Sequence, residues 1–440
     1  MSELTAAQFL ENPRGLRDFL NAHGTFELQQ YPTGMFPASP HELSKETGMG
    51  MSWFRDSALI TDALYEDGQV EVAASSASAM LTALVNNEKI LDQVIAGNTE
   101  VRLPVRFEGE TLANDTEPRR QNDSTGYVLW IVGKMANDGE LVLSQEEYRV
   151  LAKTVDYLAA IEYWRDADEG HWEEGRRIQI PSIGVCIAGL REMHRLLCDE
   201  PMQNNIQTLI QKGYDAIETI ENSYGTTDIV EWDGMSEDPY PAGIHTHALI
   251  RKALREFTPN VREYDAAMLF LVEPLDIFDE EKSRKIVRKI EKNLEREKGF
   301  ARYPGDTYWC PRFPHIMSIE ERTSMAEGRL DMREQLSAGV YATQSEAQWT
   351  IFDPMIASYW GKSYEITGDP SDKESQIIRT DRSLDQLVKT EDGLLKKPEA
   401  YYKEYIEGYG NVILPNENIP LNMATAALLR CVGVFERTTK

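Results

Sequence analysis

The chain has 440 residues, of which 41% are hydrophobic, so it is long and apolar enough to bury a large core. Its 46 basic and 73 acidic residues give a net charge of −27, which disfavours nucleic acid and anionic membranes as partners. No apolar run reaches the roughly 20 residues that a membrane-spanning helix needs. The N-terminal residues lack the basic and apolar segments of a signal peptide, so we expect a cytoplasmic location.

Apolar residues recur at three- and four-residue steps along most of the chain, whereas strand-like alternation is nearly absent. Ser144 precedes an acidic first turn, as a helix N-cap does, and Pro181 suits the first position of a helix. Besides a short helix near the N-terminus, the pattern predicts helices over 53–66, 70–97, 121–137, 144–165, 181–198, 203–223, 242–257, 262–273, 280–297, 345–366, 373–389 and 421–437.

The connections between several of these helices are long and rich in Gly, Pro, Trp, Tyr and charged residues. Long loops in a compact domain are usually functional or disordered, and the aromatic content argues against disorder. No low-complexity tract or Pro/Ser linker divides the chain, and loosely paired helices are compatible with a closed helical toroid. The long connections are 98–120, 166–180, 224–241, 298–343 and 390–420.

The loop over 162–180 concentrates carboxylates around Trp164 and Trp172. Crowded carboxylates and adjacent apolar rings both raise the pKa of an acid, which is what a general acid requires. On composition alone, a solvated acidic loop is the alternative. The acids in this loop are Asp166, Asp168, Glu169, Glu173 and Glu174.

A second acidic loop, over 390–408, places Glu399, Glu404 and Glu407 among three tyrosines. Glycoside cleavage needs two carboxyl groups on opposite sides of the bond, and aromatic rings offer surfaces on which sugars stack. The alternative for this segment is an amphipathic surface helix over 397–407.

Two Arg-containing segments have the composition of polar binding elements. Arg55 stands beside Asp56, and the segment Arg302–Trp309 contains Asp306; an Arg that only donates and an Asp that only accepts can together hold vicinal hydroxyls. A structural ion pair explains either segment equally well. His245 and His247 do not share a helix face and have no evident third ligand, and no phosphate-binding glycine loop occurs, so we expect neither a metal nor a cofactor.

Taken together, six segments in chain order resemble glycoside hydrolase family 15, the glucoamylases, and the related helical domain of the phosphorylase kinase α and β subunits. The most specific resemble the family's D-x-G-x-W-E-E and R-Y-P-x-D-x-Y motifs. The segments are Tyr31–Pro37, Trp53–Ser57, Gln121–Gly126, Asp168–Glu174, Tyr264–Leu269 followed by Arg302–Tyr308, and Lys397–Ala400.

The resemblance implies an all-α fold, an (α/α)6 barrel or six-hairpin toroid with long aromatic-rich loops. Residues 1–440 would form one catalytic domain, with residues 1–30 as an N-terminal helical extension. The implied activity is that of an inverting, exo-acting α-glucosidase, which releases β-glucose from an α-glucan or an α-linked glucose disaccharide.

The resemblance also implies the roles of individual residues. Glu173 would be the general acid and Glu399 the general base, with Glu407 as second choice because Glu407–Gly410 resembles another form of the base motif. Inversion requires these carboxyl groups to lie roughly 6.5–9.5 Å apart. The implied substrate-binding residues are Trp53, Arg55, Asp56, Asp123, Trp172, Glu174, Arg302 and Tyr303.

Three departures from the family pattern leave the substrate open. The usual L-T-W-S-x-A becomes Leu421–Ala426 without a Trp, the segment Ile178–Gly184 is closer to the kinase subunits, and no β-sandwich precedes the helices. The alternative function is a non-catalytic glucan-binding or regulatory domain. Within the enzyme class, trehalose or an α-1,6-linked disaccharide is an open alternative substrate, and the oligomeric state is open as well.

Overall fold

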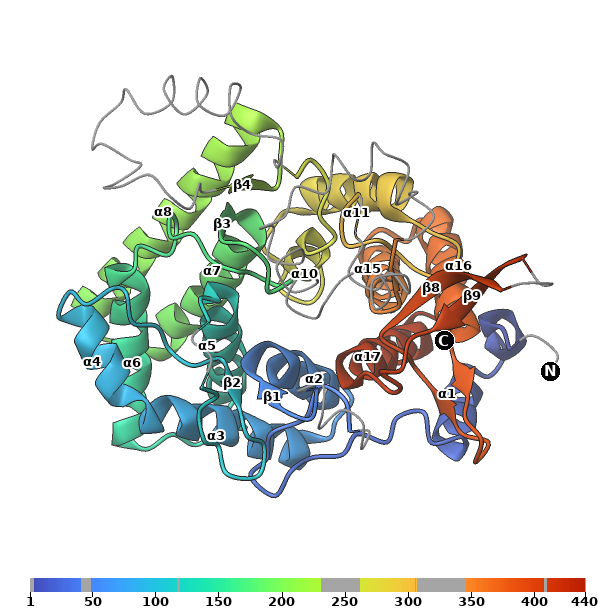
Figure 1. The fold of residues 1–440 in the computed structure, drawn as a ribbon, viewed down its shortest axis with the longest axis horizontal. Coiled ribbons are helices and arrows are strands. Elements are labelled where there is room, and N and C mark those ends of the chain that lie inside the picture. The colour runs from blue at the N-terminus through green and yellow to red at the C-terminus, as the bar shows by residue number, and fades with distance from the viewer. Residues whose placement is uncertain are drawn as a thin grey trace.

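The computed structural model describes residues 4–40, 49–116, 119–230, 262–304, 306, 346–406 and 410–439. Within them, six helices form a closed inner ring in which each contacts the next and the last contacts the first (Figure 1). The inner helices are α2 (Phe54–Glu66), α5 (Asn122–Asn137), α7 (Ile180–Leu196), α10 (Met268–Val272), α15 (Phe352–Thr367) and α17 (Asn422–Thr438).

Further helices surround this ring, as Figure 1 shows. The all-α class and the (α/α)6 barrel expected from the sequence are confirmed. The outer helices are α1 (Pro13–Ala22), α3 (Val70–Asn86), α4 (Glu88–Ile95), α6 (Gln145–Ala160), α8 (Glu200–Tyr224), α11 (Glu280–Leu294) and α16 (Pro370–Asp385), and a 3-10 turn (Ala6–Phe9) precedes them.

The inner helices pack closely because small residues face one another between α5 and α7. A Cβ atom added to Gly126 would lie 2.7 Å from the backbone nitrogen of Cys186, and one added to Gly189 would lie 2.6 Å from the carbonyl oxygen of Gly126. Such separations are too short for any side chain, so these two glycines permit the close approach. The segments around them are buried on every side, which explains their near-continuous apolar sequence.

The predicted helix boundaries hold in most places. Ser144 accepts a hydrogen bond from the backbone nitrogen of Glu147 in a capping box, and Pro181 lies in the first turn of α7. The helix predicted over 70–97 is two helices that meet at Asn87, whose side chain donates to the carbonyl of Ala83. The helix predicted over 242–257 lies outside the described residues.

The helix predicted over 262–273 is shorter than expected, because only 268–272 are helical. The backbone of the preceding residues bonds to other loops instead: the Arg262 carbonyl accepts from Thr227, and the Ala266 nitrogen donates to the Arg302 carbonyl. These bonds across the chain compete with the local helical ones.

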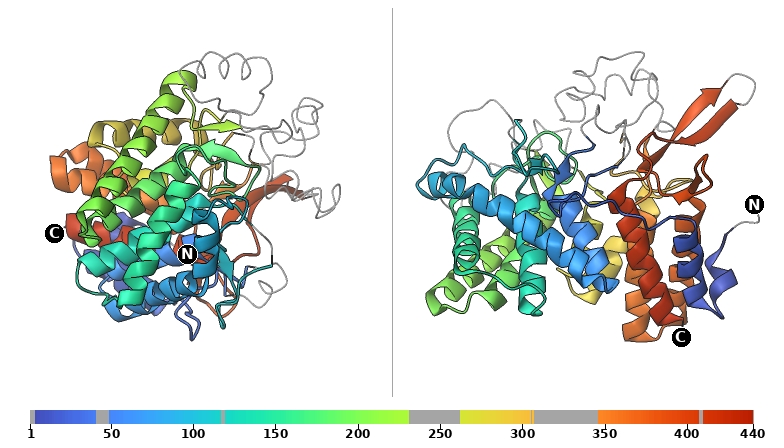
Figure 2. Two further views of the ribbon diagram at one scale, coloured as in Figure 1. Left: turned by 90° about the vertical axis from the view of Figure 1, so that its left-hand side faces the viewer. Right: turned by 90° about the horizontal axis from the view of Figure 1, so that it is seen from below.

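Short antiparallel strands lie between the helices, and Figure 2 shows that the longest pair, β8 and β9, projects at one end of the toroid. The surface helix considered over 397–407 is wrong, since 400–406 form β8, and tyrosine is a residue that strands favour. The pairs in the described chain are β1 (Ser52–Trp53) with β2 (Arg106–Phe107), β3 (Arg177–Gln179) with β4 (Asp228–Val230), β6 (Val388–Lys389) with β7 (Leu395–Lys396), and β5 (Gln348–Trp349) with β8 (Ala400–Ile406) and β9 (Gly410–Pro415).

Buried ion pairs connect the inner helices in their C-terminal halves. Arg430 of α17 binds both Asp62 of α2 and Glu273 at the end of α10. Lys362 of α15 binds Glu273 at 2.7 Å, and Lys134 of α5 binds Asp62 at 2.7 Å. Burial raises the pKa of Glu273, but Arg430 and Lys362 outweigh it and lower the pKa to about 2.

The N-terminal helix α1 packs against the outside of α16 and α17. Its Leu16 and Leu20 share a small apolar cluster with Leu428, Val432 and Phe435 of α17. None of the helices in the described ranges is long and apolar enough to cross a membrane.

Candidate active site

Arg55, in the first turn of α2, brings together segments that are far apart in the chain. It is buried, and its guanidinium donates to Asp123 Oδ2 and to Glu173 Oε1, both at 2.9 Å. Asp123 is fully buried in the first turn of α5, so it reaches the site through Arg55. The N-terminal ends of α2 and α5 therefore face the acidic loop that carries Glu173.

Glu173 occupies a strained backbone position. Its φ is +56°, in the left-handed region that side chains other than glycine rarely adopt, and such strain tends to occur at functional sites. The carboxyl group is 25% exposed, and its second oxygen accepts a hydrogen bond from Arg119 at 2.8 Å. Arg55 and Arg119 together fix the direction of this carboxylate.

Asp56 interacts electrostatically with both predicted catalytic carboxylates. Burial raises the pKa of Asp56 to about 6; Arg55 opposes this shift, whereas the negative charges of Glu173 and Glu399 add to it. Contacts place residues 173 and 399 in the same region: the Thr350 nitrogen donates to the Glu399 carbonyl, and the ring of the preceding Trp349 lies 6.2 Å from that of Trp172, the neighbour of Glu173.

Glu399 is buried and lies just before strand β8. The side-chain amides of Asn416 and Asn418 donate to its Oε2 at 2.6 and 2.7 Å. Burial raises the pKa of Glu399 above its ordinary value, while these two hydrogen bonds and the charge of Arg302 limit the rise. The backbone of Glu399 is also fixed, because its carbonyl accepts from the Thr350 nitrogen at 3.1 Å.

Glu174 accepts hydrogen bonds from several surrounding side chains. Tyr303 and Arg262 bind its two oxygens, and Arg177 adds a bond at 3.1 Å. Burial alone would raise the pKa of Glu174, but Arg262, Arg302 and Arg177 together lower it. Glu174 is therefore an ionised anchor for the cationic side of the site.

Arg302 is fixed between carboxylates and aromatic rings. It donates to both oxygens of Asp306 at 2.9 Å, and lies 3.5 Å from Glu174. Its guanidinium carbon lies 4.7 Å from the ring centroid of Trp349 and 5.3 Å from that of Trp172. This bidentate and stacked arrangement fixes the orientation of the guanidinium.

The two tryptophans expected at the site differ in exposure. Trp172 is partly exposed, and its Nε1 donates to Asp265 at 2.8 Å; this hydrogen bond fixes the orientation of the ring. Trp53 is 6% exposed, with the Arg106 guanidinium 5.3 Å from its ring centroid. Trp172 is thus the better placed of the two to stack against a sugar ring.

Several residues that support the site carry no sequence motif. Arg119 comes from a long loop, and Arg262 from the part of the predicted helix 262–273 that is not helical in the structure. Asn416 and Asn418 lie beyond the predicted base, and a polar loop residue gives no periodic signal. Glu407, the second choice for the base, lies outside the described residues. A cavity of about 240 Å³ is lined by residues that include Tyr264 and Asp265, and neither Glu173 nor Glu399 lines it.

The comparison with protein families matches residues 20–212 to the glycosyl hydrolases family 15. The resemblance to glycoside hydrolase family 15 is confirmed. The family-15 match includes Arg55, Asp123 and Glu173 and supports a glycoside hydrolase, whereas Glu399 lies beyond it. No curated protein sequence gives a significant match.

Solved glycosidase structures share the fold along nearly the whole chain. A glycosidase variant has a TM-score of 0.61 at 16% identity, over 98% of this chain and 97% of that one. A second variant, in complex with glucose, has a TM-score of 0.60 at 17% identity over the same shares. The glucoamylase of Saccharomycopsis fibuligera has a TM-score of 0.58 at 12% identity, over 99% of this chain and 96% of that one. At such low identities the likeness shows the (α/α)6 fold alone.

Proposed function

We propose that this protein is an inverting, exo-acting α-glucosidase that removes terminal glucose from an α-glucan or an α-linked glucose disaccharide. The main supporting observation is that Glu173 and Glu399, two carboxylates from distant loops, are linked through the neighbouring rings of Trp172 and Trp349, which lie 6.2 Å apart. Two carboxyl groups around one polar, aromatic-lined site meet the basic requirement for glycoside hydrolysis.

In the proposed reaction, Arg55, Asp56 and Arg302 hold the hydroxyl groups of the terminal glucose. Glu173 donates a proton to the glycosidic oxygen, and the leaving sugar departs as an alcohol. Glu399 accepts a proton from the water that attacks C1 from the opposite face, so that the product is β-glucose. Among the described residues, Asn416 and Asn418 both bind Oε2 of Glu399, and in the proposed reaction the other oxygen, Oε1, receives this proton.

A direct test combines a substrate panel with carboxamide variants. Maltose, isomaltose, trehalose and soluble starch are incubated with the protein, and the anomer of released glucose is followed by proton NMR. We expect initial β-glucose from at least one substrate, and a loss of roughly 100- to 10,000-fold in Glu173→Gln and Glu399→Gln. Glu169→Gln, in the same acidic loop, is the matched control and keeps most of the activity. Initial α-glucose, or full activity in Glu173→Gln, would refute the mechanism.

One observation favours a second function, a non-catalytic glucan-binding module. Glu173 is paired with both Arg55 and Arg119, which suits a residue that only binds sugar as well as an acid that loses one partner when substrate enters. The same panel separates the two functions: no glucose from any substrate, together with oligosaccharide binding by calorimetry, would establish the binding module.

A further inference from the structure

Lys397, two residues before Glu399, is a fully buried lysine. Its Nζ donates to the Ser383 carbonyl at 2.8 Å, to the Ser383 hydroxyl at 2.9 Å and to Gln386 Oε1 at 2.8 Å. All three acceptors are neutral, and within the described part of the chain no carboxylate contacts this amine. A buried lysine without a carboxylate partner is costly, so its retention calls for a physical reason.

The acceptors belong to the C-terminal end of α16. Ser383 lies in the last turn of this helix, and Gln386 is its C-cap. Carbonyl groups at a helix C-terminus lack partners within the helix and carry partial negative charge, so they readily accept hydrogen bonds from an amine. Lys397 therefore uses the end of α16 as a fixed anchor.

Gln386 also binds the chain on the other side of Glu399. Its carbonyl accepts a hydrogen bond from the Tyr401 hydroxyl at 3.0 Å. The residues two before and two after Glu399 are thus both tied to Gln386, while Glu399 itself turns its carboxylate to Asn416 and Asn418.

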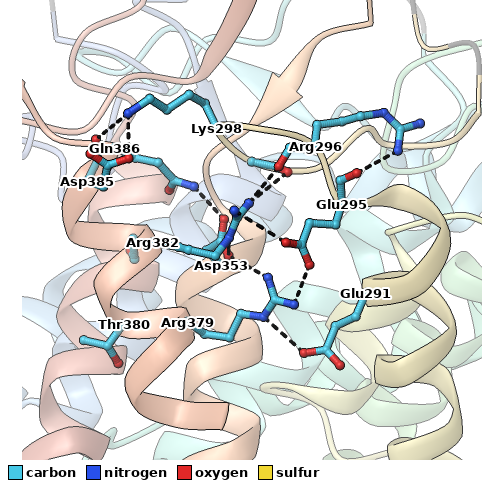
Figure 3. Close-up of polar contacts among 12 residues, drawn as sticks. Glu291, Glu295, Arg296, Lys298, Asp353, Arg379, Thr380, Arg382, Asp385 and Gln386 are labelled. Atoms are coloured by element: carbon cyan, nitrogen blue, oxygen red, sulfur yellow. Dashed lines mark hydrogen bonds and ion pairs between the residues drawn. The ribbon is translucent and has the colours of Figure 1, made fainter. Parts of the chain in front are cut away.

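Gln386 is itself held rigidly, as Figure 3 shows. Its Nε2 donates to Asp353 Oδ2 at 2.6 Å, and Asp353 is fully buried in the first turn of the inner helix α15. Arg382 and Arg379 of α16 donate to the other oxygen of Asp353 at 2.9 and 3.3 Å. An anchor fixed by two helices transmits little motion to the segment bound to it.

We propose that Lys397 is a positioning residue for Glu399: by binding the C-terminal end of α16, it fixes the segment 397–401 and thereby the place of the catalytic carboxylate. This inference rests on the proposed function, in which Glu399 is the general base. The neighbouring Lys396 offers a matched contrast, because it binds Gly24 and Glu27 of the N-terminal segment instead.

The test measures hydrolysis of α-glucosyl fluoride, because its good leaving group lowers the barrier to bond cleavage in every variant and brings slow rates into the measurable range. Lys397→Met, Lys396→Met, Glu399→Gln and the double variant Lys397→Met/Glu399→Gln are compared. In Lys397→Met we expect kcat to fall about 10- to 100-fold with KM within about threefold, because a displacement of about 1 Å costs that much. Lys396→Met stays within about twofold of the parent protein.

The double variant supplies the decisive comparison. If Lys397 acts through Glu399, its loss costs nothing once the base is gone, and the double variant is as active as Glu399→Gln alone. Losses that multiply in the double variant, or an unchanged kcat in folded Lys397→Met, would overturn the positioning role. Where Lys397→Met does not fold, Tyr401→Phe removes only the hydroxyl bond to Gln386; a lowered kcat supports the proposal and an unchanged kcat overturns it.

The two proposals fail differently in this experiment. Full activity in Glu399→Gln would refute the base assignment, and the positioning role with it. An inactive Glu399→Gln beside a fully active Lys397→Met would leave the proposed function intact and refute the positioning role alone.

Discussion

Asn418 and Glu399 hold each other through two hydrogen bonds. The side-chain amide of Asn418 donates to Glu399 Oε2 at 2.7 Å, and the backbone nitrogen of Glu399 donates to the Asn418 carbonyl at 3.0 Å. The first bond stabilises the ionised carboxylate and the second fixes its backbone. These bonds fix the orientation of the buried Glu399 side chain, and its hydrogen-bond partners limit the rise in its pKa that burial causes.

Replacing Asn418 with alanine should shift the acid side of the pH profile. The base must be ionised to act, so kcat/KM rises with pH through the pKa of Glu399. Since the Asn418 amide lowers this pKa, its removal raises it, and we expect the acid limb to move up by about one pH unit. The profile of kcat/KM between pH 3 and pH 8 measures the shift. Asn411→Ala, on the exposed part of β9, serves as the control, and an unmoved limb in Asn418→Ala would contradict the assignment.

Asp56→Asn should stabilise the protein above pH 6 while weakening sugar binding. Burial raises the pKa of Asp56 to about 6, helped by Glu173 and Glu399 and opposed by Arg55. The folded state therefore binds this proton more tightly than the unfolded state, and stability is lost as pH rises from about 4 through 6, by about 3 kcal/mol.

Urea unfolding at pH 4.5 and pH 7.5 tests this linkage. The asparagine that replaces Asp56 in the variant cannot ionise, so no folding free energy is lost there as the pH rises. The stability of Asp56→Asn relative to the parent protein should therefore increase by about 2 kcal/mol from pH 4.5 to pH 7.5. An equal difference in unfolding free energy between the two proteins at both pH values would show that the pKa of Asp56 is not raised in the folded state. Weaker glucose binding in the more stable variant would identify a stability cost of function.

The fold can be predicted from the sequence because helical periodicity and helix-capping residues are local features that recur along the chain. Helical periodicity predicted the inner helices, and Ser144 and Pro181 marked helix starts that the structure confirms. The signal failed where contacts across the chain decide the outcome. Residues 262–267 bond to distant loops and so do not continue helix α10, and 400–406 pair with β9 instead of forming a helix.

The site was accessible only in part, for a related reason. The motif residues Arg55, Asp123 and Glu173 lie in direct contact, and their charges explain why they cluster. Arg119 and Asn418 come from loops with no period, so their contacts depend on how the loops fold. Nothing in the sequence marks Lys397 as buried, and its burial is seen only in the structure.

Arg430→Met should strongly destabilise the inner ring. Arg430 binds both Asp62 and Glu273, and its loss would leave these buried carboxylates with fewer cations. Breaking a buried pair by removing one partner typically costs about 3–5 kcal/mol. Denaturant unfolding at pH 7 measures the loss. The double variant Arg430→Met/Glu273→Gln should recover part of it, and no recovery would mean that packing of the Arg430 stem accounts for the effect.

Lys397 should give the stability of the protein a distinctive dependence on alkaline pH. Burial lowers the pKa of Lys397 to about 7, although Asp353, Cys431 and Asp385 oppose the shift. Between pH 7 and about pH 10 the unfolded state binds this proton and the folded state does not, so the lysine's contribution to stability rises with pH by up to about 1.4 kcal/mol per unit. Lys397→Met lacks this contribution. The stability of the parent protein relative to Lys397→Met should therefore grow by about 2 kcal/mol between pH 7 and pH 9 in urea unfolding. A constant difference for Lys397→Met would mean that this amine is charged in the folded protein throughout that range, and that the end of α16 compensates its burial fully.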